Sequence, residues 1–258
     1  MTEQLKIQTE SPMSIVNSKH KRIKHAWSEF TEGHLNKVLN AIKRRKKPRT
    51  IKSNFLNARD YMLVKFTAYL GLRPGEATHA RDVDIDFSRR EYFVNGMFNK
   101  CRKDRFQAIS PAFIDDLKKY ILFKNKYFPS QYLFPSIKHP EKQISVSRFE
   151  KMFLSSIRDA GLYRLREVID EGSFQLPKSE FPVYALRKYK GTKIWKTLGD
   201  VKAVALVLGH KDFRSCEPYI YSDTSIKHEI ERKLAVSDEK ILKKSFSGSP
   251  RMRFLTGF

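Results

Sequence analysis

The sequence predicts a mainly α-helical domain with a small antiparallel β-sheet, an α+β fold. Several stretches of the 258-residue chain carry apolar residues at every third or fourth position, as on one face of a helix. Between them, residues 83–87, 91–97 and 105–109 form short runs that alternate or are rich in aromatic and β-branched residues. With 40% hydrophobic residues, a chain of this length can bury a core.

The first helices are expected where capping and stop signals flank the apolar pattern. A helix should follow Thr31, because the spacing of the next apolar residues matches a helical face. These are Leu35, Val38, Leu39 and Ile42. A second helix is expected over 54–70, with Gly71 ending it. Pro74 suits the first position of a third helix, which would place Glu76 in its favourable first turn.

Two further helices are expected after the strands. Pro111 can open one of them. Ser147 and Glu150 have the spacing of a capping box, so the next helix is expected to begin there and to stop at Gly161. Residues 162–182 are irregular and charged, and we interpret them as an insertion.

The charge of the chain indicates its kind of partner. Lys and Arg number 51 against 28 Asp and Glu, a net charge of +23, which favours nucleic acid over a membrane surface. No apolar run approaches the roughly 18 residues of a membrane span, and the N-terminus does not resemble a signal peptide. Two cysteines make neither a disulfide framework nor a zinc pattern, so we expect a reducing, intracellular location.

Four short motifs occur along the chain. In order they are Gly71-Leu-Arg73, the hairpin run Lys100-Cys-Arg-Lys-Asp-Arg105, Tyr184-Ala-Leu-Arg187, and Leu208-Gly-His210 with Tyr219 nine residues later. This series resembles the catalytic domain of tyrosine recombinases, the phage integrase family. One position departs from the family, because Tyr184 stands where the family usually has His.

The resemblance implies a tyrosine recombinase catalytic-domain fold and a role for each motif. Arg73 and Arg187 would hold the phosphate oxygens through paired N–H bonds, which suits guanidinium better than ammonium. His210 would add a donor, and Lys100 would protonate the leaving oxygen. Tyr219 would attack the phosphodiester and form a 3′-phosphotyrosine. The ester is conserved, so the reaction would need no metal, cofactor or ATP.

Two further residues extend this site. Glu76 is a supporting residue in the first turn after Arg73. Tyr184 has two interpretations. As a hydrogen-bond donor, its phenol replaces the usual His well, and this is the interpretation we favour. As a base, a phenol with pKa near 10 replaces His badly at neutral pH.

Basic residues beside the motifs are candidates for phosphate contacts, although such runs are more often a solvated face. They are Arg44, Arg45, Lys46, Lys47, Arg102, Lys103, Arg105, Lys188 and Lys190.

We expect a basic flexible arm at 1–28, the catalytic domain at 29–236, and a tail at 237–258 that is exchanged between protomers in related enzymes. Family members usually carry a separate N-terminal DNA-binding domain, and fewer than 30 residues cannot form one. The chain is therefore expected to be a minimal recombinase or to rely on a partner. The implied partners are double-stranded DNA, further copies in a homo-oligomer (a tetramer on DNA), and an accessory DNA-bending protein.

The sequence predicts a site-specific recombinase of the integrase or invertase type. Two alternatives stay open at this point. One is a catalytically weak DNA-binding regulator on the same fold, and the other is a relaxing enzyme like the type IB topoisomerases. Formation of a covalent DNA adduct separates the regulator from the two enzymes, and strand exchange between two sites separates these two from each other.

Overall fold

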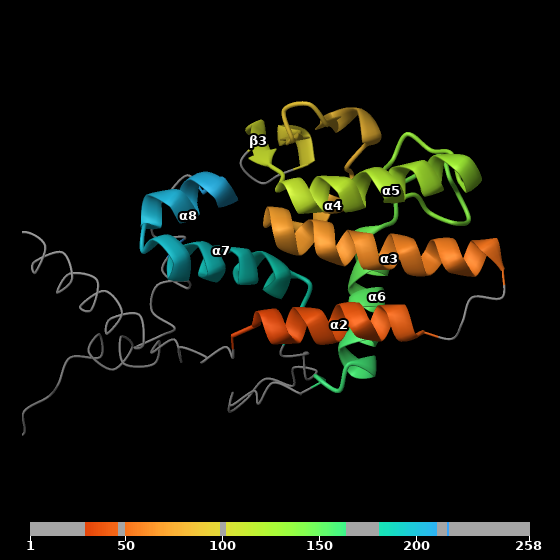
Figure 1. Ribbon diagram of the computed structural model, residues 1–258, viewed down its shortest axis with the longest axis horizontal. Coiled ribbons are helices and arrows are strands. Elements are labelled where there is room, and N and C mark those ends of the chain that lie inside the picture. Colours follow the sequence, from red (N-terminus) through yellow and green to blue (C-terminus); the bar gives the residue numbers. More distant parts are fainter. Residues whose placement is uncertain (1–28, 46–49, 99–101, 164–180, 211–215, 217–258) are drawn as a thin grey trace, which may run out of the picture.

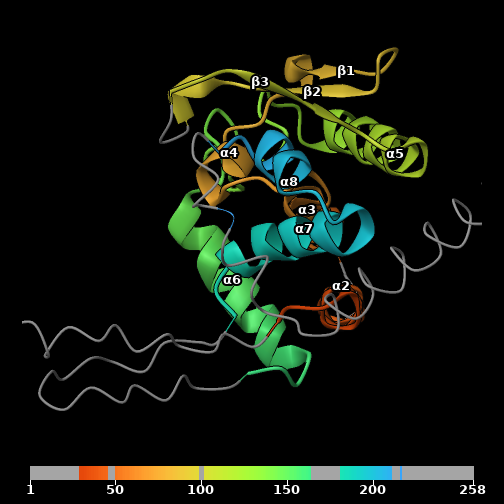
Figure 2. The same ribbon diagram turned by 90° about the vertical axis from the view of Figure 1, so that its left-hand side faces the viewer.

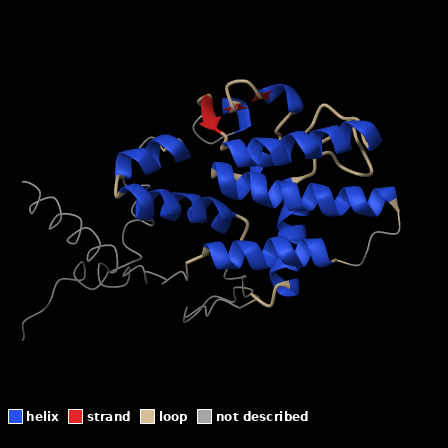
Figure 3. Ribbon diagram, in the orientation of Figure 1, coloured by secondary structure: helices blue, strands red, loops and turns tan. Residues whose placement is uncertain are grey.

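A computed structural model of the protein describes residues 29–45, 50–98, 102–163, 181–210 and 216 (Figure 1). Within these residues the chain forms α-helices and one three-stranded antiparallel sheet, which confirms the predicted fold class (Figure 3). None of the helices in these ranges is both long and apolar enough to cross a membrane.

The elements have the following bounds. The helices are α2 (Glu32–Arg44), α3 (Ile51–Leu70), α4 (Pro74–Thr78), α5 (Pro111–Tyr127), α6 (Val146–Asp159), α7 (Tyr184–Leu198) and α8 (Val201–Leu208). The strands are β1 (Ile85–Asp86), β2 (Glu91–Val94) and β3 (Arg105–Ala108), and two short 3-10 turns cover Asp82–Asp84 and Gly96–Phe98.

Helix α3 is the centre of the molecule. Its buried residues lie on nearly all of its sides, as expected for a helix enclosed by others. It contacts α2, α4, α5 and α7, and Figure 1 shows it between α2 and α5. The sheet joins this core through Tyr92, whose ring meets that of Phe66 edge-on at 5.0 Å between centroids. Helix α3 therefore packs directly against α4, which follows Arg73, and against α7, which carries Arg187.

The three strands are shorter than the sequence predicts. The sheet order is β1-β2-β3, with Ile85 opposite Tyr92 and Val94 opposite Arg105. The outer ends of the predicted runs are 3-10 turns instead, because local carboxylates bind the backbone there. Asp84 accepts a hydrogen bond from the N–H of Arg81, and Asp104 accepts one from the N–H of Gly96.

Two helix starts differ from the prediction. Helix α3 begins at Ile51 rather than at residue 54, because the hydroxyl of Thr50 accepts a hydrogen bond from the N–H of Ser53 at 3.1 Å. The expected cap at Ser147 is wrong. Ser145 caps α6 instead, and its hydroxyl accepts from the N–H of Arg148 at 3.2 Å.

Gly71 meets two demands at the end of α3. Its φ of 66° is left-handed, as a glycine that ends a helix often is. A Cβ at this position would also lie 2.7 Å from Leu208 Cδ2 and 2.9 Å from Lys190 Cγ. A glycine is therefore what allows α7 and α8 to close on the end of α3.

We expect Gly71→Ala to cost more stability than Gly199→Ala. Gly199 ends α7 with φ 64°, but a Cβ there meets nothing within 4 Å. Both changes carry the left-handed penalty of about 1–2 kcal/mol. Gly71→Ala adds overpacking, about 1–3 kcal/mol more. Urea denaturation of the two variants measures the difference in the free energy of unfolding. Equal losses would show that Leu208 and Lys190 can move away from the added methyl group at no cost.

Candidate active site

Glu76 is the hub of the site. Its carboxylate lies in the first turn of α4 and is 0% exposed. It accepts from the backbone N–H of Arg73 at 2.8 Å and from Arg73 Nη1 at 3.0 Å. Arg105 of β3 approaches as a fork, with Nη1 at 2.9 Å and Nη2 at 2.7 Å from the two carboxylate oxygens. The predicted supporting residue therefore fixes two arginines at once.

The charge state of Glu76 follows from these contacts. Burial by itself would raise the pKa of the carboxyl group. The hydrogen bonds and charge of Arg105, the N–H of Arg73 and the charge of Arg187 outweigh it, so the pKa lies below its usual value. Glu76 is therefore an anion at neutral pH, and it compensates part of the charge of the arginines around it.

Arg187 joins three elements from inside the protein. It is fully buried on α7, where its Nη1 donates to the carbonyl of Gly71 at 2.7 Å and its Nη2 donates to the carbonyl of Leu208. Its Nη1 also lies 3.9 Å from Glu76 Oε2. These carbonyls belong to the C-cap residue of α3 and to the last residue of α8, and the negative dipole ends of the two helices favour a cation. Arg187 is thus anchored within the fold beneath the more exposed Arg73.

His210 follows the left-handed Gly209 that ends α8. Burial, and then the charges of Arg187, Arg73 and Arg105, lower the pKa of its imidazole to about 4. The ring is therefore neutral at pH 7 and carries one N–H donor. Its Nδ1 lies 3.3 Å from the sulfur of the buried Cys216. Among the predicted site residues, the structure thus brings Arg73, Glu76, Arg187 and His210 together.

Arg105 has a larger role than the sequence indicated. It was one candidate among many for phosphate contacts, yet it forms the bidentate pair with Glu76. It also passes so close to Gly209 that a Cβ there would lie 2.8 Å from Arg105 Cδ. The only available signal was its place as the last residue of the Lys100–Arg105 motif.

Tyr184 is the first residue of α7, one helical turn before Arg187. Residues at this spacing lie on the same side of a helix. The Tyr184 side chain is 40% exposed, whereas Arg187 is buried. The phenol is therefore open to a ligand at this end of α7.

The hairpin between β2 and β3 is closed at its base. The N–H of Gly96 donates to Asp104 Oδ1 at 2.6 Å, and a Cβ at Gly96 would lie 2.8 Å from the backbone of Lys103. Phe98 stacks on the ring of His79, which follows α4, at 4.1 Å. Lys100 lies outside the described residues, as does Tyr219.

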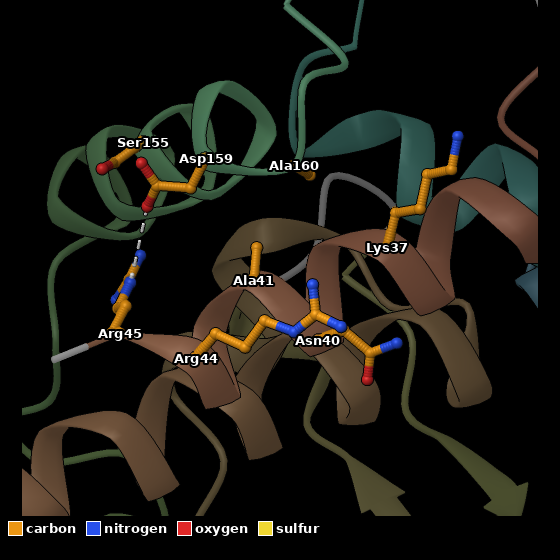
Figure 4. A pocket seen from close by; sticks show the side chains of 8 residues that line it. All are labelled: Lys37, Asn40, Ala41, Arg44, Arg45, Ser155, Asp159 and Ala160. Carbon is orange, nitrogen blue, oxygen red and sulfur yellow. Dashed lines mark ion pairs between the residues drawn. The ribbon is translucent and has the colours of Figure 1, made fainter. Parts of the chain in front are cut away.

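The basic candidates divide by their surroundings. Arg44 is exposed on α2, and it lines a hollow between α2 and α6 that also includes Lys37 (Figure 4). Arg45 lies beside it but bonds within the protein. It pairs with Asp60 at 2.9 Å and with Asp159 at 3.8 Å. Arg45 therefore holds α2 to α3 and α6, which differs from the phosphate contact expected of it.

The remaining candidates lie nearer the motifs. Arg102 and Lys103 are exposed beside the hairpin loop, and Lys188 is half-buried on α7. Lys190 packs against Gly71, and burial lowers the pKa of its amine. Lys46 and Lys47 lie outside the described residues.

Comparison with solved structures identifies the fold. The XerA recombinase matches with a TM-score of 0.59 and 19% identity, over 80% of this chain and 64% of that one. The XerH site-specific recombinase on a palindromic difH substrate matches with 0.60 and 19%, over 79% and 51%. The Tn1549 transposon integrase in complex with a circular intermediate DNA matches with 0.59 and 17%, over 80% and 66%. This is the fold of tyrosine recombinase catalytic domains.

The family model named "Phage integrase family" matches residues 30–225. The chain belongs to the phage integrase family, as its motifs predicted. It spans about one half to two thirds of the length of the solved proteins above. No curated protein matches the sequence significantly.

We expect Glu76→Gln to destabilise the protein strongly. It would leave the buried guanidiniums around it without their counter-charge, and breaking a buried ion pair typically costs about 3–5 kcal/mol. Glu32→Gln is the matched control, because Glu32 pairs with Lys193 at 3.0 Å on the surface and should change stability by no more than about 1 kcal/mol. Denaturant unfolding of both variants tests this, and similar losses would contradict a central role for Glu76.

The low pKa of His210 predicts a pH dependence of stability. Its folded pKa, about 4, lies below the usual 6.5, so the unfolded chain takes up a proton first as the pH falls. The contribution of His210 to the free energy of unfolding is therefore complete above about pH 6.5 and is lost towards pH 4.

Denaturation of wild type and His210→Gln at about pH 7 and about pH 5 measures this contribution, because the other histidines titrate in both chains. Wild type should lose more stability over this interval than the variant. Equal losses would show that His210 titrates normally in the folded protein.

Proposed function

We propose that this chain is a site-specific DNA recombinase that cleaves and rejoins double-stranded DNA through a 3′-phosphotyrosine. One observation carries the proposal. Arg73, Arg105 and Arg187 come from three separate segments and lie around a single buried carboxylate, Glu76, and His210 is close enough for the charges of these arginines to lower its pKa. Three guanidiniums against one carboxylate leave an excess of two positive charges, which complements a phosphodiester and its more highly charged transition state.

The arginines would divide the work. Arg73 has a side chain that is 22% exposed, so it is the one placed to donate to the phosphate oxygens. Arg187 and Arg105 would act mainly through their positive charge. Arg105 would also fix Glu76, and Arg187 would fix the ends of α3 and α8. His210 would donate its single N–H as a neutral ring. Tyr184, exposed at the start of α7, would add a hydroxyl donor.

The reacting groups in this proposal are Tyr219 and Lys100. Tyr219 stands nine residues after His210, and its phenolate would attack phosphorus as the DNA 5′ oxygen leaves. Nearby cations favour the phenolate. Lys100 would give its proton to the leaving 5′ oxygen. The phosphotyrosine keeps the energy of the ester, so a DNA hydroxyl can reverse the step without ATP.

The partners follow from the same proposal. XerH and the Tn1549 integrase were solved on DNA, and the net charge of +23 suits the same ligand. We propose that the chain acts as a homo-oligomer, a tetramer on DNA. The arm at 1–28 and the tail at 237–258 lie outside the described residues and stay predictions.

The nucleophile is tested with a nicked suicide substrate made from DNA that flanks the gene. Wild type should form a covalent adduct, and Tyr219→Phe should form none while still binding DNA, because phenylalanine has no hydroxyl to attack with. Tyr221→Phe is the control and should form the adduct. Loss of the adduct in Tyr221→Phe alone would move the nucleophile by two residues, and no adduct in wild type would favour a DNA-binding regulator.

We expect Arg73→Lys to slow adduct formation by roughly 10²–10³, because a point charge loses the paired N–H geometry. Duplex affinity should change far less, since the interaction is strongest in the transition state. Arg89→Lys, an exposed arginine in the turn after β1, is the control and should match wild type. A parallel loss of affinity and rate would show that Arg73 is only a phosphate anchor.

A further inference from the structure

A hollow whose charged lining residues are all basic lies between the beginnings of α3 and α6. Its volume is about 560 Å³, and its walls come from the start of α3, the segment 136–145 and the first turn of α6. Five of its twelve lining residues are Lys or Arg, and none is Asp or Glu. The five are Lys52, Arg59, Lys138, Lys142 and Arg148. We call it the α3–α6 hollow.

Most of this charge is available to an external anion. Arg59 is buried and bonds to Asp60 and to the carbonyl of Pro135. The other four cations are exposed, and no ion pair within the described ranges involves them. His139 also lines the hollow, and its partner Glu141 is not among the lining residues. The hollow is therefore a concave surface of uncompensated positive charge.

The fold does not require cations at these places. Lys52 and Arg148 lie in the first turns of α3 and α6, and neither turn contains an acidic residue. A helix N-terminus favours an acidic residue there by about 0.3–1 kcal/mol, as Glu32 and Glu76 supply in α2 and α4. Residues that work against local stability without a structural gain indicate a function. An anion in the hollow would be stabilised by the cations and by both helix ends.

The hollow lies beside the candidate active site. Gln143 lines it, and its side-chain nitrogen is 2.8 Å from His79 Nε2. His79 directly follows α4, and Arg73 directly precedes it, so one short helix joins the contact at Gln143 to Arg73. Figure 2 shows the beginning of α6 next to α4 on the same side of the molecule.

We propose that the α3–α6 hollow binds the sugar–phosphate backbone of the duplex that flanks the cleaved bond. This rests on the proposed function, because DNA is the substrate proposed there. The four exposed cations would contact phosphates within a few base pairs of the one at Arg73 and would fix the position of the duplex over α4. Such contacts set register and affinity and carry no base sequence.

The test is the salt dependence of binding to a fluorescein-labelled random-sequence duplex, read by anisotropy. Each phosphate contact contributes about 0.9 to the slope of log affinity against log salt. The triple variant Lys138→Ala/Lys142→Ala/Arg148→Ala should therefore have a slope shallower by about 2–3 than its parent. The control carries Lys118→Ala/Lys119→Ala/Lys126→Ala on α5, which lies on the other side of α3 from α6 in Figure 2, and its slope should be unchanged.

All these chains carry Tyr219→Phe, so that binding is read without chemistry. A slope and affinity in the triple variant equal to those of the control would overturn the proposal. Binding of inorganic pyrophosphate is measured for the same variants. If the triple variant loses pyrophosphate binding while its duplex binding is unchanged, the proposal is also overturned, because the hollow then holds a small anion. Wild type that binds the duplex but never forms an adduct would contradict the proposed function, and the slope comparison would still test the hollow.

Discussion

The buried carboxylate of Glu76 is the constraint on which the site depends. Three guanidiniums within reach of one another repel, and burial makes this repulsion stronger than it would be in water. Glu76 holds Arg73 and Arg105 side by side through four hydrogen bonds to its two oxygens, and Arg187 lies 3.9 Å from one of these oxygens. Because Glu76 also lies in the first turn of α4, the charge network and the local helix stabilise each other.

The backbone ends of α3 and α8 form the second part of the site. Arg187 binds the carbonyls of Gly71 and Leu208, and Gly71 leaves room for Leu208. A cation thus replaces water at two helix C-termini, where carbonyls lack partners within the helix. The same contacts bring His210 beside the arginines, where burial and their charge keep it neutral. The contacts that pack the ends of α3 and α8 together therefore also place the charges of the site.

The cations of this protein have different uses, although the sequence shows them alike. Arg45 and Arg59 meet at Asp60 and hold α2, α3 and the segment before α6 together. Lys52 and Arg148 instead face an open hollow. A net charge of +23 therefore divides into internal pairs and a surface left for a polyanion.

The sequence by itself determined the features that depend on a few neighbouring residues. Thr31 caps α2, Gly71 ends α3, and Pro74 opens α4, because each of these acts within about one helical turn. The four motifs also identified the family to which the chain belongs. The choice of Ser145 over Ser147 shows the limit, since both serines are suitable caps and local sequence does not distinguish between them.

Only the tertiary structure decided which distant groups meet. Arg105 pairs with Glu76 across 29 positions, and Arg187 reaches Gly71 across 116. The α3–α6 hollow likewise joins two stretches that lie far apart in the sequence, the first half of α3 and residues 136–148. Local periodicity contains no information about such contacts, because they depend on how helices pack around α3. For that reason the sequence identified Arg73, Arg187 and His210 as site residues, while the structure revealed that Arg105 pairs with Glu76 and that Arg45 forms ion pairs with Asp60 and Asp159.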